Sequence, residues 1–158
     1  MMLIDSERAR GSWLTYKRLQ LDIQQEEYKV IIDFIHADFA QLKNELIKHC
    51  QQWREKLTDL LHDRAKQQLD SILGYFTSNS KILLSTPRNF DQLRERIHLL
   101  DTCSNDIGSM DDRIKPVEDM YQALADFDVA TSDVETARKM SMRPRLENFK
   151  DNLVEAGE

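Results

Sequence analysis

The chain has 158 residues, of which 41% are hydrophobic and 32% charged, with only four glycines and three prolines. This balance is typical of one amphipathic helical domain, and it disfavours a disordered chain or two separate domains. The net charge of −6 disfavours nucleic acid and anionic membranes as partners, since both are bound through clustered lysine and arginine. Because no stretch approaches about twenty consecutive apolar residues, and Asp5 and Glu7 stand where a signal peptide is apolar, we expect a soluble, intracellular chain.

The first predicted helix lies in residues 12–73, which contain neither proline nor glycine, after a flexible N-terminus at residues 1–11. A polar gap at residues 21–27 predicts a bend or a helix start, so we place the main helix from about Glu27 to Thr77. Apolar side chains recur at helical spacing on both sides of this gap, from Trp13 to Phe76. They are Trp13, Tyr16, Leu19, Ile23, Tyr28, Ile31, Phe34, Ile35, Phe39, Leu42, Leu46, Cys50, Trp53, Leu57, Leu60, Ala65, Leu69, Ile72 and Phe76.

A second long helix is predicted from Asn89 to Phe127, because one apolar seam runs through it at steps of three or four residues. Asn89 and Gln92 form a capping-box pattern at its start. The short connection after residue 80 predicts that this helix folds back antiparallel on the first. The seam consists of Phe90, Leu93, Ile97, Leu100, Cys103, Ile107, Met110, Ile114, Val117, Tyr121 and Leu124, and we expect it to be buried.

Pro116 interrupts this seam, at a cost of about 3 kcal/mol in a helix interior. The apolar stripe nevertheless keeps its phase from Ile114 through Val117 to Tyr121. The pattern therefore favours a kinked helix, or two nearly collinear helices, over a reversal of the chain. Ile114, Val117 and Tyr121 should then contact one partner helix, the one that carries Trp53.

A shorter helix is predicted after a loop at residues 128–132, with Ser132 and Glu135 as a capping box and Pro144 dividing or displacing it. We expect residues 128–158 to be a loop and a short, partly frayed terminal helix. No segment shows the period-two alternation of a half-buried strand. The predicted fold is therefore all-α, an elongated antiparallel bundle of two long helices at residues 12–127 plus the shorter C-terminal helix.

Catalytic and cofactor motifs are missing from the sequence. Gly11, Gly74, Gly108 and Gly157 cannot supply the spacing of a phosphate-binding loop. His36, His49, His62 and His98 form no metal-ligand pair of helical spacing, and Cys50 and Cys103 fall on apolar stripes, as core cysteines do. The carboxylates are spread over solvent-facing positions, so no acid–base pair stands out. We predict no enzyme activity, cofactor, metal or small-molecule substrate.

The candidate functional residues are therefore helix-packing residues. Trp13 and Trp53 stand within apolar stripes, so we interpret them as helix-contact anchors, with an exposed partner contact as the alternative. The full set of predicted packing or interaction residues is Trp13, Trp53, Ile114, Pro116, Val117, Tyr121 and Leu124.

Residues 112–124, with the sequence DRIKPVEDMYQAL, resemble a segment of the axonemal dynein heavy chains, whose stem carries a similar string of Arg, Ile, Pro, an aliphatic residue, an acidic pair, Met-Tyr and Leu. Upstream, Pro87 followed by the leucine-rich helix is similar to the same family. Trp53 with Leu57, Ala65 and Leu69 is similar to the helix before it. The resemblance spans roughly residues 13–127, whereas Met140, Met142 and Pro144 depart from the family's next helix.

This resemblance implies a non-catalytic segment of the N-terminal stem, ahead of the linker, with the ATPase ring and the microtubule-binding stalk elsewhere. It implies neighbouring dynein heavy-chain bundles or other dynein subunits as protein partners, and the ciliary axoneme as the location. The starting Met-Met suggests a fragment, a short isoform or a truncated relative. The alternative interpretation is an unrelated helical coiled-coil scaffold or tether that pairs with another coil.

Overall fold

The computed structural model describes residues 5–157, which form two compact units. The first unit contains the chain up to Asp63 together with Ala123–Val129. The second contains Arg64–Gln122 and the chain from Ala130 onward. The boundaries between the units therefore fall inside the segment 12–127, which the sequence predicts to be one bundle.

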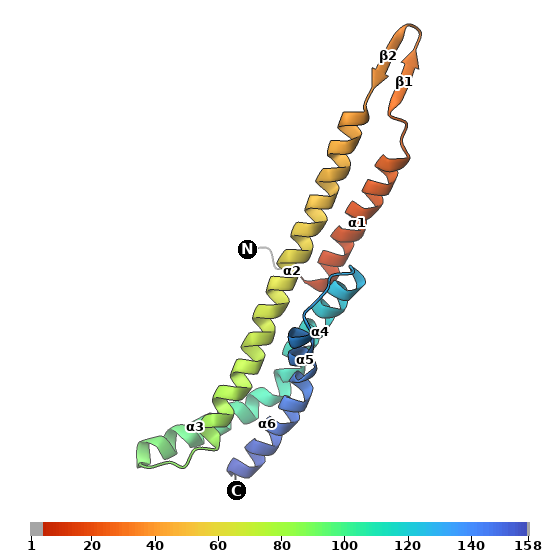
Figure 1. Ribbon diagram of the computed structural model, residues 1–158. Coiled ribbons are helices and arrows are strands. Elements are labelled where there is room, and N and C mark those ends of the chain that lie inside the picture. The colour runs from red at the N-terminus through yellow and green to blue at the C-terminus, as the bar shows by residue number, and fades with distance from the viewer. Residues whose placement is uncertain (1–4, 158) are drawn as a thin grey trace. The chain divides into compact units, whose positions relative to one another are not determined.

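In the first unit, helix α1 (Ser6–Gln25) lies antiparallel to the N-terminal half of α2 (Ala40–Leu83) (Figure 1). The Asp5 carboxylate caps α1 by accepting a hydrogen bond of 2.7 Å from the backbone amide of Arg8. Ser6–Gly11, predicted to be flexible, thus form the first turns of a helix. Residues 1–4 of the same predicted segment lie outside the described residues.

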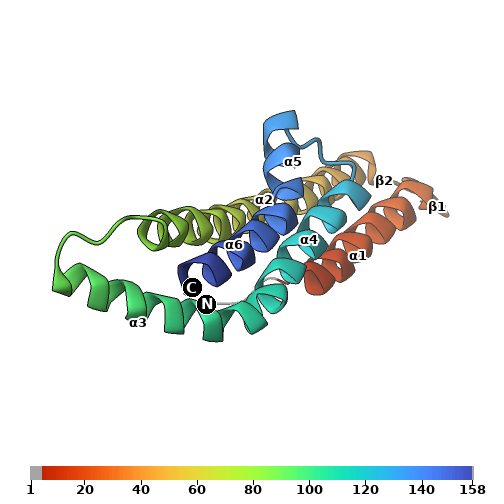
Figure 2. The same cartoon turned by 90° about the horizontal axis from the view of Figure 1, so that it is seen from below.

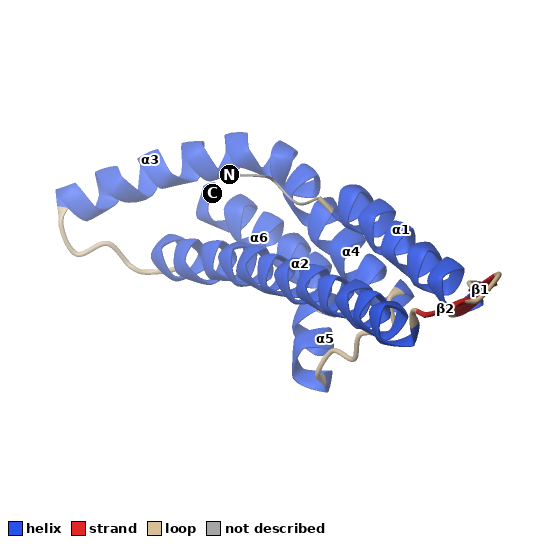
Figure 3. Cartoon of the chain, turned by 90° about the horizontal axis from the view of Figure 1, so that it is seen from above, coloured by secondary structure: helices blue, strands red, loops and turns tan. Residues whose placement is uncertain are grey.

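A two-stranded antiparallel hairpin, β1 (Lys29–Ile32) and β2 (Ile35–Asp38), joins α1 to α2 and extends beyond the ends of both helices (Figure 3). The prediction of a helix from Glu27, and of a chain without strands, is wrong here. The segment is rich in β-branched and aromatic residues, which favour strands. Asp33 opens the two-residue turn with a positive φ of 53°, a conformation that Asp tolerates better than most residues.

Lys43 contacts both the base of the hairpin and the C-terminal end of α1. Its ammonium donates hydrogen bonds of 2.7 Å to the backbone carbonyls of Gln24 and Glu26, which have no partner within the helix. The same ammonium lies 5.9 Å from the centre of the Tyr28 ring. One side chain on α2 thus satisfies the C-terminus of α1 and contacts the first residue of the hairpin segment.

Helix α2 has 44 residues, but it begins at Ala40 rather than near Glu27 and ends at Leu83 rather than at Thr77, so the predicted bounds of the main helix are wrong at both ends. The Thr77 hydroxyl donates to the carbonyl of Leu73 inside the helix, so the polar cluster after residue 76 does not end it. The helix ends at the loop before α3 instead, where the Ser85 hydroxyl donates to the carbonyl of Ile82.

In the second unit, α3 (Phe90–Asp106) leads through a 3-10 turn at Ile107–Ser109 into α4 (Met110–Asp126). The predicted cap at Asn89 is confirmed, since its side chain accepts a hydrogen bond of 2.8 Å from the Gln92 amide. Helix α6 (Met142–Gly157) lies between α3 and the C-terminal half of α2 (Figure 2). Phe76 and Phe149 pack there with ring centres 5.4 Å apart.

The predicted second helix is therefore two helices, and the break falls at Gly108 rather than at Pro116. Helix α4 continues through Pro116, as the phase of the seam predicts. Pro116 and Asp112, whose carbonyl loses its intrahelical partner, both lie on the exposed side of α4. The freed carbonyl is on the solvated side, so the helix accommodates the proline.

The C-terminal part also divides into two helices, α5 (Asp133–Met140) and α6, joined at Ser141. The predicted cap at Ser132 is confirmed by a hydrogen bond from the Glu135 amide. Pro144 falls in the first turn of α6, where its missing amide hydrogen costs no helical bond. Helix α6 extends to Gly157, into the segment expected to be partly frayed, while Glu158 lies outside the described residues. The all-α class is confirmed, with the hairpin as a small addition.

Candidate interaction surfaces

The C-terminal half of the predicted apolar seam, on α4, is buried in the core. Ile114, Val117 and Leu124 are fully buried, and Tyr121 exposes only 4% of its surface. Pro116 itself is exposed and borders a hollow whose lining includes Ile72 of α2. Helix α4 thus lies against the Arg64–Leu83 part of the helix that also carries Trp53.

A buried polar contact fixes α5 on this seam. The Tyr121 hydroxyl donates a hydrogen bond of 2.6 Å to the carboxylate of Glu135, and both residues are buried. Burial raises the pKa of the Tyr121 phenol, and the adjacent Glu135 carboxylate raises it further. The phenol therefore stays protonated and acts as a structural donor.

Arg143 of α6 makes charged contacts with α4. Its guanidinium donates 2.9 Å and 2.8 Å hydrogen bonds to the Glu118 carboxylate and a third, of 3.2 Å, to Asp111. These bonds from Arg143 hold the pKa of Glu118 below its usual value, against the opposing effect of partial burial. The group lies at the surface, so it orients α6 on α4 and contributes little to stability.

Tyr75 on α2 meets polar groups of α3 in a second contact. Its hydroxyl lies 3.5 Å from the Cys103 sulfur and 3.3 Å from the Asp106 carboxylate, while the Arg113 guanidinium lies 5.5 Å from the ring centre. Burial raises the pKa of Tyr75, and Cys103 and Asp106 raise it further. Cys103 is buried, as predicted for a core cysteine, while Tyr75 and Asp106 are half-buried.

Trp13, in the first unit, is a core anchor. Its ring exposes 9% and stacks on Phe127 with ring centres 4.6 Å apart. The Arg54 guanidinium and the Lys17 ammonium cover the ring at 5.4 Å and 5.0 Å, and Arg54 also donates to Gln20. The cation–π contacts and the stack bury one large side chain between α1, α2 and the end of α4.

Trp53 differs, because 41% of its surface is exposed. Its ring is parallel to that of Tyr16 on α1 at 6.1 Å, and its indole N–H donates a 2.8 Å hydrogen bond to Nε2 of His49. Trp53 therefore packs at the edge of the α1–α2 pair, with one side of its ring exposed to solvent. Sequence spacing alone did not separate it from Trp13, since both stand on apolar stripes.

The N-terminal half of the seam, expected to be buried, is exposed on α3. Phe90, Leu93 and Ile97 expose 79%, 41% and 53% of their surfaces. With Arg94, His98 and Asp101 they line a shallow hollow along this one helix. Among the described residues, the side chains of Arg94 and Asp101 take part in no hydrogen bond or ion pair. We call Phe90, Leu93 and Ile97 the α3 face.

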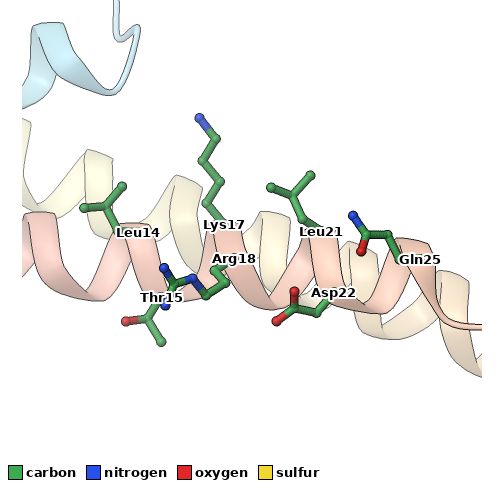
Figure 4. Close-up of a pocket in the computed structure, with 7 residues that line it drawn as sticks. All are labelled: Leu14, Thr15, Lys17, Arg18, Leu21, Asp22 and Gln25. Atoms are coloured by element: carbon green, nitrogen blue, oxygen red, sulfur yellow. The ribbon is translucent and has the colours of Figure 1, made fainter.

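The hollow on α1 is also a surface furrow. Figure 4 shows that its seven lining residues all come from α1, with Leu14, Lys17 and Leu21 on one side and Thr15, Arg18 and Asp22 on the other. A furrow between side chains of a single helix has no opposing wall, and it differs in this from the concave pockets that hold substrates. Across residues 5–157, no three histidine, cysteine, aspartate or glutamate side chains are placed to hold a metal ion. None of the described helices is long and apolar enough to cross a membrane.

Comparison with known proteins identifies the family of this chain. A family model described as the dynein axonemal heavy chain 2/5/8 coiled-coil matches residues 55–158, which include all of α3 to α6. The chain belongs to this dynein heavy-chain family. The resemblance inferred from residues 112–124 is thereby confirmed. The match also extends to α5 and α6, where we expected a departure at Met140, Met142 and Pro144.

Individual dynein heavy chains are similar at low identity. Dynein axonemal heavy chain 2 of Mus musculus is 25% identical over 141 residues, covering 89% of this chain, and that of Homo sapiens is 25% identical over 118 residues, covering 75%. The Dynein-1-beta heavy chain of the flagellar inner arm I1 complex of Chlamydomonas reinhardtii is 27% identical over 148 residues, covering 85%. The chain spans about 3% of the length of each relative.

Proposed function

We propose that the chain is a non-catalytic structural segment of a dynein heavy-chain stem, ahead of the linker, that works by helix packing. The observation that carries this proposal is the match of the coiled-coil family model to residues 55–158. This membership disagrees with the alternative of an unrelated scaffold or tether. The seam residues Ile114, Val117, Tyr121 and Leu124, with Trp13, act within the chain, because they are buried.

The α3 face is the surface through which this segment contacts a neighbouring helix of the dynein assembly. In the sequence it continues, at steps of three or four residues, the seam that is buried on α4, so a second helix laid along it would extend a packing pattern that the chain already uses. Arg94 and Asp101 lie at the edge of the face, one heptad apart. The occupant is therefore an amphipathic helix that places an acidic residue against Arg94 and a basic residue one heptad away against Asp101.

We further propose that the chain acts in the cytoplasm at the ciliary axoneme, through protein contacts rather than through nucleic acid, a membrane or a small-molecule substrate. Support comes from the names of the relatives, which are axonemal or flagellar dynein heavy chains. Trp53, half-exposed at the rim of α1 and α2, is a secondary contact for the same assembly.

The test is co-purification of the tagged chain from ciliated cells. Ile97→Asp introduces a charge on the α3 face, and we expect it to remove dynein heavy chain from the purified material. Val134→Asp is the matched control, since Val134 is an exposed aliphatic residue of the same unit, 71% exposed, away from α3. Equal recovery of dynein heavy chain with both variants, or none with the unaltered chain, would contradict the proposal.

A further inference from the structure

The hairpin has one face without any charged or polar side chain apart from the Tyr28 hydroxyl. Its register pairs Val30 with Ala37 and Ile32 with Ile35, and paired residues of an antiparallel ladder share a face. A backbone hydrogen bond of 2.6 Å from Phe39 to Tyr28 continues this pairing by one step. We call the side chains of Tyr28, Val30, Ile32, Ile35, Ala37 and Phe39 the hairpin face.

The opposite side of the hairpin is amphipathic, because the alternate pairs are Lys29 with Asp38 and Ile31 with His36. Charged groups at Lys29 and Asp38 and the imidazole of His36 suit a surface in contact with water. The two sides therefore differ in chemistry, and only the hairpin face lacks the charged side chains that favour contact with water.

The hairpin face is largely uncovered by the rest of the chain. Ile32 and Ile35 expose 64% and 57% of their surfaces, Tyr28 and Phe39 expose 45% and 46%, and Phe34 at the turn exposes 88%. At roughly 200 Å² for a fully exposed large side chain, these residues with Val30 expose an apolar area on the order of 600 Å². A two-stranded hairpin is only marginally stable in water, so packing another surface against an apolar face of this size would stabilise it.

We propose that a second copy of this chain covers it, by packing hairpin face against hairpin face around a two-fold axis. None of the six side chains of the face is charged, and the Lys43 ammonium borders it only at Tyr28. Together with Phe34, its exposed area on the order of 600 Å² compares with roughly 800 Å² per partner in a stable interface, so it suits a small two-fold contact. Aromatic residues stand at both ends, Phe34 at the turn and Tyr28 with Phe39 at the base, with aliphatic residues between them. In an antiparallel two-fold arrangement, each turn lies over the partner's base, so aromatic rings meet aromatic rings and the aliphatic residues meet at the centre.

This self-association goes beyond the proposed function, since the hairpin lies outside residues 55–158, which the family model matches. The two surfaces are also independent, because the α3 face belongs to the second unit and the hairpin to the first. A failure of one proposal therefore leaves the other unaffected.

Sedimentation equilibrium of the full chain over the micromolar range tests the proposal. Ile31 and Ile32 are adjacent, of the same residue type and almost equally exposed, at 66% and 64%, but they belong to opposite sides of the hairpin. We expect the unaltered chain and Ile31→Lys to reach twice the chain mass of 18.6 kDa. Ile32→Lys should weaken the dimer at least about 30-fold, as loss of a central interface residue does.

The truncations Ile32→Ala and Ile31→Ala repeat the comparison without a new charge, and circular dichroism of all four variants checks that the helices persist. A weaker dimer for the residue-32 variants alone supports the proposal. A monomeric unaltered chain throughout the concentration range overturns it. Equal effects of the residue-31 and residue-32 variants also overturn it, since a general loss of the hairpin would not distinguish the two sides.

Discussion

The hydrogen bond between Tyr121 and Glu135 gives the sharpest test of the buried seam. Tyr121→Phe removes only the hydroxyl, which donates over 2.6 Å to a carboxylate on α5 while both residues are buried. A hydrogen bond to a charged group contributes about 1.5–3 kcal/mol, and the variant leaves a buried carboxylate with one donor fewer. At about 2–4 °C per kcal/mol for a chain of this size, Tm should fall by about 3–12 °C.

Urea unfolding followed by circular dichroism measures this loss, and Tyr28→Phe is the control. The Tyr28 ring is 45% exposed, and in residues 5–157 its hydroxyl makes no hydrogen bond. We expect the control to change the free energy of unfolding by less than about 0.5 kcal/mol. Equal changes for the two variants would refute the assignment of Tyr121 as a structural donor.

The same contact has a pH signature. Because the folded protein raises the pKa of Tyr121, the stability it contributes is present below the unfolded value of about 10 and is lost as the pH rises through the folded pKa. The difference between the unaltered chain and Tyr121→Phe should therefore be constant near neutral pH and decrease in strong alkali. A difference that grows with alkalinity would contradict this sign.

The remaining predictions concern single positions. Pro116→Ala restores a backbone donor in α4 and should raise the free energy of unfolding by about 1–3 kcal/mol in urea titrations; a lower midpoint would show that the helix depends on the proline. Trp13→Ala should cost about 3–5 kcal/mol and Trp53→Ala clearly less, because only Trp13 is buried, and the reverse order would contradict the packing described. Since Arg143 lowers the pKa of Glu118, the small contribution of this surface pair is present above the ordinary glutamate pKa of about 4.5 and is lost as the pH falls through the folded pKa, so in urea titrations Arg143→Met should destabilise the chain slightly at pH 7 and progressively less in acid, and an effect that grows toward low pH would contradict this sign. Calorimetric titration with ATP and magnesium should show no saturable binding, and micromolar binding that a charge-matched control protein lacks would contradict the non-catalytic assignment.

The sequence predicted the features that depend on local chemistry. Asn89 and Ser132 cap helices because their side chains accept backbone hydrogen bonds whatever the tertiary context. The continuation of α4 through Pro116 followed from the phase of the apolar seam, and the family followed from residues 112–124. These inferences need no knowledge of which segments meet in space.

The hairpin and the exposed α3 face were missed for different reasons. Tyr28, Ile31, Phe34, Ile35 and Phe39 fit a helical stripe, and only their β-branched and aromatic character could have indicated strands. The α3 face shows the second limit of a periodic pattern. An apolar stripe predicts which side of a helix will be buried, but it does not indicate whether the residues that bury it belong to the same chain or to another.

The most direct test of the central claim is photo-cross-linking of the chain in isolated axonemes. A photoreactive phenylalanine analogue at Leu93 on the α3 face, with one at Val134 as the control, reports the nearest neighbour in the assembly by mass spectrometry. We expect the probe at Leu93 to cross-link to a helical segment of a dynein heavy chain or another dynein subunit, and the probe at Val134 to give little product. Cross-links from Leu93 only to proteins outside the dynein assembly, or equal labelling from both positions, would contradict a packing role in the dynein stem.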